Sequence, residues 1–215
     1  MINIVYEDNH LLVVIKPINM PSQKDDSNDP NLLDELKKYL VKKYNKKGAA
    51  YLGLVQRLDR PVGGLMVFAK TSKAASRLSE QIRQHNVKKE YHAVVCGKID
   101  KYGTFTDYLL KDTQTNMVKI DKNGKEAVLD YELVSFKNNY SLVKINLKTG
   151  RSHQIRVQFS YHGFPLYGDQ RYNEKAKVKQ QIALYATKLT FSHPITKEEL
   201  TFEINFPSTQ PWDIF

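Results

Sequence analysis

Short runs of apolar and β-branched residues recur along the chain, and most of them alternate with polar positions. Residues 2–16, INIVYEDNHLLVVIK, hold two such runs around a polar turn, and Pro17 ends the second. Runs bounded in this way by turn residues are typical of short β-strands. Three more strands are predicted within EYHAVVCGKI at 90–99, ALYATKLTFSHP at 183–194 and LTFEINF at 200–206.

Two asparagine-centred turns are predicted in the middle of the chain. Asn123-Gly124, within MVKIDKNGKEAV, predicts a β-hairpin, because both residues readily adopt the positive φ angles of a tight hairpin turn. Asn138-Asn139 predicts a second turn, between the alternating strands VLDYELVSFK and YSLVKINLK.

Helical spacing of apolar residues appears first after the polar loop PSQKDDSND. Leu33, Leu36 and Leu40 recur every three or four positions, which predicts a helix over residues 30–46. Asp29 is the expected N-cap, and Pro30 suits the first helical position. The Lys-rich segment KKYNKKG closes this helix.

Two further helices are predicted, and together with the strands they set the fold class. Thr71 or Ser72 can cap a helix running through Gln84, and a short helix begins at Ser152 and ends at Gly163. Strands outnumber helices and look mostly antiparallel, so we predict an α+β fold. No repeat or linker divides the chain, so residues 1–215 are expected to form a single domain.

Charge narrows the class of partner. The 215 residues carry 33 Lys+Arg against 23 Asp+Glu, a net charge of +10, which favours a polyanion such as nucleic acid. The longest apolar stretch, LLVVI, is too short to span a membrane, and no signal peptide is evident. The single cysteine, Cys96, rules out an internal disulfide and is expected to fill the core. We expect a cytoplasmic, monomeric protein without a metal site.

The segment GLVQRLDRPVGG holds the first candidate for chemistry, Asp59. Arg57 and Arg60 flank it, and nearby positive charge favours the ionised carboxylate and lowers its pKa. An ionised carboxylate can act as a nucleophile. The same residues also fit a turn aspartate before Pro61, paired with a surface arginine, and the local sequence leaves both interpretations open.

The segment KTGRSHQIRVQF is the second candidate. Gly150 permits a sharp turn from strand to helix, and Arg151, His153 and Arg156 then cluster near the first helical turn. Two guanidinium groups and an imidazole could hold phosphates or pair with a carboxylate. A solvated basic helix face would look the same.

Tyr91 in KKEYHAVV is the third candidate. A tyrosine on a strand usually packs half-buried with its hydroxyl bonded to a polar group, and this chain has 13 tyrosines. By themselves these three segments indicate a basic protein with an Asp/Arg centre that handles RNA.

Taken together, the segments resemble the RluA-type pseudouridine synthases, which convert uridines in ribosomal or transfer RNA into pseudouridines. The match runs in order along nearly the whole chain, through VYEDNHLLVVIKP, LGLVQRLDRPVGGLMVFAKTSKAASRLSEQ, KEYHAVV, LKTGRSHQIRVQFSYHGFPLYGDQRY and ALYATKLTFSHP. The resemblance implies the pseudouridine synthase fold, a mostly antiparallel mixed sheet flanked by helices with a cleft along the sheet. It implies no cofactor and a structured RNA stem-loop as substrate.

The resemblance also implies roles for individual residues. Asp59 matches the catalytic aspartate, which attacks the ribose at C1′ or the base. Tyr91 matches the tyrosine that stacks on the base, and Arg156 matches the arginine that pairs with the aspartate. Ile155 matches an apolar pocket residue, and Arg57 the arginine that enters the RNA where the uridine was flipped out. This flipping is needed because a stacked uridine cannot reach a carboxylate.

Some positions depart from the pattern, and alternatives follow from them. Gln56 stands where the family usually has histidine, and Asn19 stands where it has glycine. The small RNA-binding domain found at the N-terminus of many relatives is not expected here, so RNA contacts are assigned to the helix at 30–46 and the lysines at 174–179. One alternative is a catalytically idle RNA-binding or ribosome-assembly protein. Another is a glycosidase or DNA-base glycosylase, which would need Glu90 or Asp169 as a general acid.

Overall fold

The computed structural model describes residues 2–215, which form two compact units. The first unit contains the chain up to Val87 together with Lys188–Ile204, and the second contains Lys88–Thr187 and Asn205–Phe215. The strand β10 (Leu184–Ser192) contributes residues to both units. Each unit combines antiparallel strands with helices, so the predicted α+β class is confirmed.

The first unit is built around strand β2 and its two neighbours, β1 and β4. The strands that lie wholly in this unit are β1 (Asn3–Glu7), β2 (Leu11–Lys16), β3 (Gly53–Leu54), β4 (Gly63–Ala69) and β11 (Glu199–Glu203). Strand β2 pairs antiparallel with β1 and β4, and β11 pairs with the end of β10. Helices α1 (Leu32–Lys43) and α2 (Ser72–Arg83) complete the unit. Its core joins β2, β4, α2 and β10 through Leu11, Val13, Leu65, Val67, Leu78 and Phe191.

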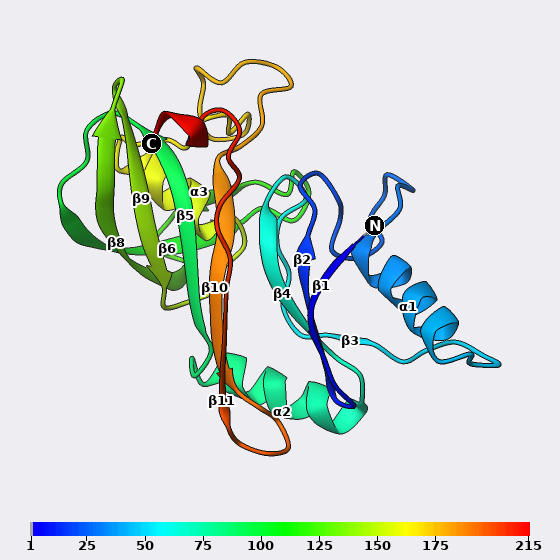
Figure 1. Ribbon diagram of the computed structural model, residues 1–215. Coiled ribbons are helices and arrows are strands. Elements are labelled where there is room, and N and C mark those ends of the chain that lie inside the picture. The colour runs from blue at the N-terminus through cyan, green and yellow to red at the C-terminus, as the bar shows by residue number, and fades with distance from the viewer. Residues whose placement is uncertain (1) are drawn as a thin grey trace. The chain divides into compact units, whose positions relative to one another are not determined.

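The second unit is an antiparallel sheet that carries one short helix. Its elements are β5 (Lys88–Cys96), β6 (Tyr102–Lys111), β7 (Val118–Ile120), β8 (Lys125–Lys137), β9 (Tyr140–Leu147), α3 (Gln154–Tyr161) and the 3-10 helix η1 (Trp212–Ile214). Strand β9 lies between β5 and β8, and β8 pairs with β6 (Figure 1). Helix α3 contributes Val157 to a buried cluster with Leu109, Val118 and Ala127. The sheet therefore supports the helix that carries several candidate residues.

The predicted cap of the first helix is wrong by two residues. The N-cap is Asn31, whose side chain accepts a hydrogen bond of 3.0 Å from the backbone N–H of Asp34. Asp29 pairs with Arg60 instead. Local sequence could not separate the two caps, because aspartate and asparagine are about equally good at this position.

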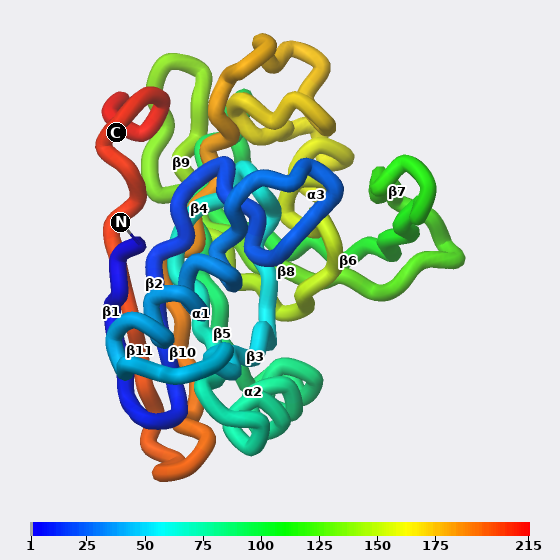
Figure 2. The backbone as a smooth tube through the Cα atoms, turned by 90° about the vertical axis from the view of Figure 1, so that its right-hand side faces the viewer, coloured from blue at the N-terminus to red at the C-terminus, as the bar shows by residue number. Residues whose placement is uncertain are grey.

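The predicted hairpin at Asn123-Gly124 is also wrong. Strands β7 and β8 both pair with β6, at Leu109↔Ile120 and Leu109↔Lys125, rather than with each other. Figure 2 shows β7 farther out along β6 than β8. A Cβ atom on Gly124 would lie 2.4 Å from the backbone carbon of Leu109, so glycine is required for a close approach of two backbones. The sequence prediction had also missed β6 itself.

Other predicted elements are confirmed. Thr71 caps α2 by accepting a 3.2 Å hydrogen bond from the N–H of Ala74, and Asn138 and Asn139 adopt φ angles of 51° and 62° between β8 and β9. Helix α3 begins at Gln154, two residues later than predicted, and ends just before Gly163, which has a φ of 87°. None of the helices in residues 2–215 has the length and apolar character needed to span a bilayer.

Candidate active site

Asp59 lies in the loop between β3 and β4, where the backbone forms a tight turn. The N–H of Val62 donates a 3.0 Å hydrogen bond to the carbonyl oxygen of Asp59, across Pro61. The predicted turn is therefore present, and the Asp59 side chain is half-buried in it. A turn and a reactive carboxylate are compatible, since the turn uses the backbone of Asp59.

Two buried polar side chains hold this loop on either side of Asp59. Ser22 Oγ donates to the carbonyl oxygen of Leu58 at 2.8 Å and accepts from its N–H at 3.3 Å. Lys16 Nζ donates to the carbonyl oxygen of Arg60 at 3.0 Å. Ser22 is 5% exposed and Lys16 is fully buried. The residues before and after Asp59 are thus fixed to β2 and the segment that follows it.

Lys16 is an unusual group, because a fully buried lysine is rare in proteins. Its ammonium donates to three carbonyl oxygens, those of Pro17, Met20 and Arg60, at 2.9, 2.6 and 3.0 Å. Burial lowers the pKa of Lys16 to about 7, while the negative charge of Asp59 acts in the opposite direction. Lys16 therefore places a titratable positive charge beneath the Asp59 loop.

The two arginines beside Asp59 have different surroundings. Arg60 Nη2 binds Asp29 Oδ2 at 2.5 Å and Ser27 Oγ at 2.6 Å, so its charge is paired with the loop before α1. Arg57 is exposed to solvent. Arg57 is thus the more exposed of the two arginines.

Asn19 has a structural explanation as a departure from the family pattern. It adopts a φ of 60°, in the left-handed region that glycine favours. Asparagine is among the residues that tolerate this region best, so it can replace glycine in this turn. Gly64, with a φ of 119°, keeps a conformation that a residue with a side chain rarely adopts.

Tyr91 and Ile155 are both buried in the second unit. Tyr91 is 8% exposed and stands on β5 opposite Ile145 of β9. Ile155 is 5% exposed, in the first turn of α3. Both side chains are therefore held by packing in regular elements, which fixes their positions more tightly than a loop would.

The segment before α3 is folded by Gln154. Gln154 Oε1 accepts hydrogen bonds from Thr149 Oγ1 at 2.8 Å and from the N–H of Arg151 at 3.1 Å, and Gln154 Nε2 donates to the carbonyl oxygen of Val128 at 3.1 Å. These bonds tie the start of the helix to β8. Arg151 Nε donates to the carbonyl oxygen of Glu126 at 2.8 Å.

Arg156 forms a buried, bidentate ion pair with Asp169, a residue that sequence analysis considered only as a general acid. Arg156 Nε and Nη2 donate to the two carboxylate oxygens of Asp169 at 2.8 and 2.7 Å. The two residues are 5% and 1% exposed. Paired planar geometry of this kind fixes both the position and the orientation of a guanidinium group.

His153 occupies the N-cap position of α3 in a left-handed conformation, with φ 52° and ψ 19°. Its side chain makes no capping hydrogen bond; instead Nδ1 lies 2.7 Å from the hydroxyl oxygen of Tyr172. The Tyr172 ring also lies over the Arg156 guanidinium, with 5.2 Å between its centroid and Cζ. Tyr172 therefore joins two candidate residues that lie three positions apart.

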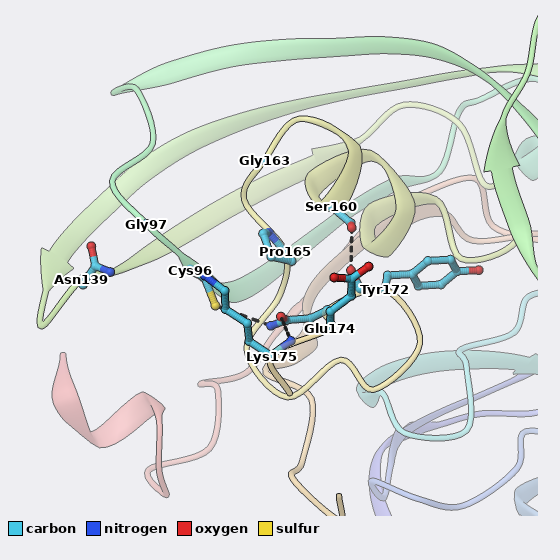
Figure 3. Close-up of a pocket in the computed structure, with 10 residues that line it drawn as sticks. Cys96, Gly97, Asn139, Ser160, Gly163, Pro165, Tyr172, Glu174 and Lys175 are labelled. Carbon is cyan, nitrogen blue, oxygen red and sulfur yellow. Dashed lines mark hydrogen bonds between the residues drawn. The ribbon is translucent and has the colours of Figure 1, made fainter. Parts of the chain in front are cut away.

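A pocket of about 410 Å³ opens beside the segment that carries Tyr172 (Figure 3). Cys96 lines it and is partly exposed, so the prediction that Cys96 fills the core is wrong. Asn173 donates a 3.6 Å hydrogen bond to the sulfur from its side-chain nitrogen. Burial raises the pKa of the Cys96 thiol, which keeps it protonated and poorly nucleophilic near neutral pH.

The candidate residues are divided between the units. Arg57 and Asp59 belong to the first, and the second holds Tyr91, Arg151, His153, Ile155 and Arg156. The sequence patterns do not single out Lys16, Ser22 or Tyr172, and they suggest only a general acid at Asp169. Lys16 and Tyr172 both lie in segments that resemble the family. Their roles are not visible there, because Lys16 binds Arg60, 44 positions away, and Tyr172 binds His153, 19 positions away.

Comparison with known proteins identifies the relatives of this chain. Residues 10–161 match a family model described as RNA pseudouridylate synthase. The chain is 35% identical over 221 residues to the ribosomal large subunit pseudouridine synthase D of Zymomonas mobilis, covering 96% of this chain and 69% of that protein. The protein of that name from Buchnera aphidicola is 32% identical, with the same coverage. The structure of human RNA Pseudouridylate Synthase Domain Containing 4 superposes with a TM-score of 0.80 at 22% identity, covering 95% of this chain and 88% of that one, which shows the shared fold.

Proposed function

This chain belongs to the RNA pseudouridine synthase family and isomerises uridine in RNA to pseudouridine; on that premise, we propose that Asp59 is the nucleophile of the reaction. The observation that carries the proposal is the fixation of Leu58 and Arg60 by Ser22 and Lys16. A carboxylate in a loop held on both sides meets the substrate without a large loss of conformational freedom.

The proposed reaction exchanges one glycosidic bond for another. Asp59 attacks C1′ or the base, the bond between N1 and C1′ breaks, and the uracil turns. A bond from C5 to C1′ then forms, and the bond to Asp59 breaks, either at C1′ in this same step or at the base afterwards, so the carboxylate is regenerated. The proton on C5 leaves, and N1 is protonated. The product is an isomer of the substrate. A carboxylate also suits the positive charge that develops at the sugar when a glycosidic bond breaks.

We assign the remaining roles to both units. Tyr91 stacks on the uracil and takes part in the final proton removal, and Arg156 pairs with the Asp59 carboxylate. Ile155 packs against the base. Arg57 enters the RNA in place of the flipped uridine. These assignments are supported by the matched motifs, by the burial of Tyr91, Ile155 and Arg156, and by the exposure of Arg57.

The two units are proposed to act as one catalytic domain. Asp59 belongs to the first unit, whereas Tyr91 and Arg156 belong to the second. The family match at residues 10–161 also crosses the division at Val87. Neither unit by itself contains the proposed set of catalytic residues.

We propose that exposed lysines contact the phosphates of the RNA, with Arg151 and His153 as further contacts. Two groups of lysines are exposed. The first group, at the end of α1 and just after it, is Lys42, Lys46 and Lys47, and the second group is Lys175, Lys177 and Lys179. Phosphate contacts of this kind supply affinity without reading sequence. The proposed substrate is a structured ribosomal or transfer RNA in the cytoplasm, and the names of the curated relatives favour the large ribosomal subunit.

The proposal is tested with Asp59→Asn and a matched control. Asp26→Asn changes an exposed carboxylate in the same unit. Pseudouridines are mapped by chemical labelling of ribosomal and transfer RNA from cells lacking the protein, supplied with each variant. We expect Asp26→Asn to restore the lost pseudouridines and Asp59→Asn to restore none, with RNA binding retained. Restoration by Asp59→Asn would exclude Asp59 as the nucleophile.

A further inference from the structure

Tyr172 makes contacts in three directions with residues that lie apart in the sequence. Its ring lies over the guanidinium of Arg156, its hydroxyl lies 2.7 Å from His153 Nδ1, and that hydroxyl accepts a 3.0 Å hydrogen bond from the N–H of Val118. We propose that Tyr172 and Asp169 are positioning residues, which hold Arg156 and His153 in the orientations that their roles require. This inference rests on the roles proposed above for Arg156 and His153.

Asp169 determines the orientation of Arg156. It receives Nε and Nη2, so the guanidinium plane is set by the carboxylate, and rotation about the last side-chain bond would break both hydrogen bonds. Asp169 Oδ1 also accepts from the N–H of Arg171 at 3.1 Å, which fixes the carboxylate in turn.

In the proposed arrangement the hydroxyl of Tyr172 sets the proton position on His153. The N–H of Val118 donates to one lone pair of this oxygen, and the hydroxyl proton is directed to His153 Nδ1. Burial raises the pKa of Tyr172, so the hydroxyl keeps its proton near neutral pH. A neutral imidazole that accepts at Nδ1 carries its proton on Nε2. His153 then presents an N–H donor suited to a phosphate oxygen or a base carbonyl.

The backbone that carries Asp169 and Tyr172 is itself anchored. Ser160 Oγ of α3 donates to the carbonyl oxygen of Tyr172 at 2.5 Å (Figure 3). The N–H of Asn173 donates to the carbonyl oxygen of Asp169 at 2.9 Å. Gly168 precedes them with a φ of 71°, and a Cβ there would lie 2.1 Å from the carbonyl oxygen of Gln181. The segment therefore returns to α3 in one conformation and offers a rigid base for the two side chains.

Stability alone is a weak reason for this arrangement. A buried ion pair pays a large desolvation cost, and apolar residues of similar volume often stabilise a fold as well or better. His153 moreover holds a left-handed backbone conformation, which is strained in a residue with a side chain. Strain and buried charge at the same place are typical of a site organised for function.

The test uses Asp169→Asn and Tyr172→Phe, with Tyr102→Phe as a matched control. Tyr102 is 71% exposed on β6. The single-turnover rate and KM are measured on an RNA that the pseudouridine mapping shows to be a substrate, and folding is followed by thermal unfolding. We expect Asp169→Asn to lower the rate about a hundredfold with little change in KM, since a misplaced group costs that much. Tyr172→Phe keeps the ring over Arg156 and is expected to raise KM about three- to tenfold, the effect of one hydrogen bond.

Two further measurements separate positioning from general stability. In a His153→Asn background, Tyr172→Phe should cause no further loss, because the hydroxyl acts through His153. Nitrogen-15 NMR of the free protein should show the His153 proton on Nε2 in the wild type and a mixture of tautomers in Tyr172→Phe. The NMR result does not depend on activity, and it applies even if Asp169→Asn fails to fold.

The outcomes distinguish this inference from the proposed function. Three results would overturn the inference and leave the proposed role of Asp59 intact. They are a wild-type rate and KM in both variants, an equal loss from Tyr172→Phe with and without His153, and a His153 tautomer that Tyr172→Phe does not change. An active Asp59→Asn protein would instead remove the proposed nucleophile and leave the tautomer result standing.

Discussion

Lys16 Nζ donates a 3.0 Å hydrogen bond to the carbonyl oxygen of Arg60, the residue that follows Asp59. A fully buried cation thus holds the backbone beside the proposed nucleophile, 44 positions along the chain from its own place in β2. The carbonyl oxygens of Pro17 and Met20 complete its surroundings. Stability and the geometry of the Asp59 loop are linked through this one side chain.

Replacing Lys16 with methionine is expected to destabilise the fold and loosen the loop. Three carbonyl oxygens lose their donor, and at about 1 to 3 kcal/mol for each buried unsatisfied group, partly offset by removal of a buried charge, the free energy of unfolding should fall by about 2 to 4 kcal/mol. Urea unfolding measures the change. Lys38→Met is the control, since Lys38 is 74% exposed and pairs only across a helix surface with Glu35.

The same variant carries a prediction about pH. Lys16 has a pKa of about 7 in the folded protein, and lysine in an unfolded chain titrates at about 10.4. Between these values the unfolded state binds more protons, so the contribution of Lys16 to the free energy of unfolding rises with pH. The difference between wild type and Lys16→Met should therefore increase from pH 7 to pH 9.5. A constant difference would show that Lys16 titrates alike in both states.

Ser22→Ala is expected to affect catalysis more than binding. The change removes the hydroxyl that binds both the carbonyl oxygen and the N–H of Leu58, the residue before Asp59. The free energy of unfolding should fall by about 1 to 3 kcal/mol, and the backbone beside Asp59 should become more mobile. We expect the single-turnover rate to fall about tenfold with KM nearly unchanged, a split that reports on transition-state contacts. Ser79→Ala on the exposed face of α2 serves as the control. A wild-type rate in Ser22→Ala would show that the loop needs no such anchor.

Glu7→Gln is expected to weaken the attachment of α1. Burial by itself would raise the pKa of Glu7, but hydrogen bonds from Lys43, Lys70, Tyr44 and Tyr39 lower it to about 2. An unfolded glutamate titrates at about 4.3, so the stabilisation is complete above about pH 5 and is lost as pH falls toward 2. Urea unfolding at pH 7 should show a loss of about 2 to 3 kcal/mol, since one pKa unit is worth about 1.4 kcal/mol.

The control for Glu7→Gln is Glu35→Gln, which breaks an exposed pair with Lys38. Surface pairs contribute about 0 to 1 kcal/mol, so little change is expected at any pH. The loss in Glu7→Gln should shrink at pH 3. A loss that persists unchanged at pH 3 would contradict the assigned ion pairs.

The lysines at the end of α1 are expected to contribute to RNA affinity. Changing Lys42 and Lys46 to glutamine together should weaken binding and reduce the salt dependence of log K by about 1 to 2, because each phosphate contact contributes about 0.7 to 0.9. The single-turnover rate at saturation should not change. Lys98→Gln with Lys101→Gln removes the same charge from exposed positions of the second unit. Equal effects of the two double variants would show a general charge effect instead of a contact surface.

By itself the sequence determined the features that depend on near neighbours and on motif order. Thr71 as a helix cap, the turn at Asn138-Asn139, the α+β class and the family follow from residues close together or from segments in a fixed order. Such features are predictable because capping and turn hydrogen bonds span only a few residues.

The tertiary structure decided everything that depends on distant partners. Asp29 and Asn31 are equally good caps by local sequence, and only the structure shows that Asn31 caps the helix while Asp29 pairs with Arg60. Asn123-Gly124 suits a hairpin by local sequence, but in the structure Gly124 packs against the backbone of Leu109. Local sequence likewise gives no sign that Lys16 reaches Arg60 or that Tyr172 reaches His153. Short-range preferences differ by about 1 kcal/mol or less, whereas a buried charge or backbone clash costs several times more, so the long-range contact decides the outcome.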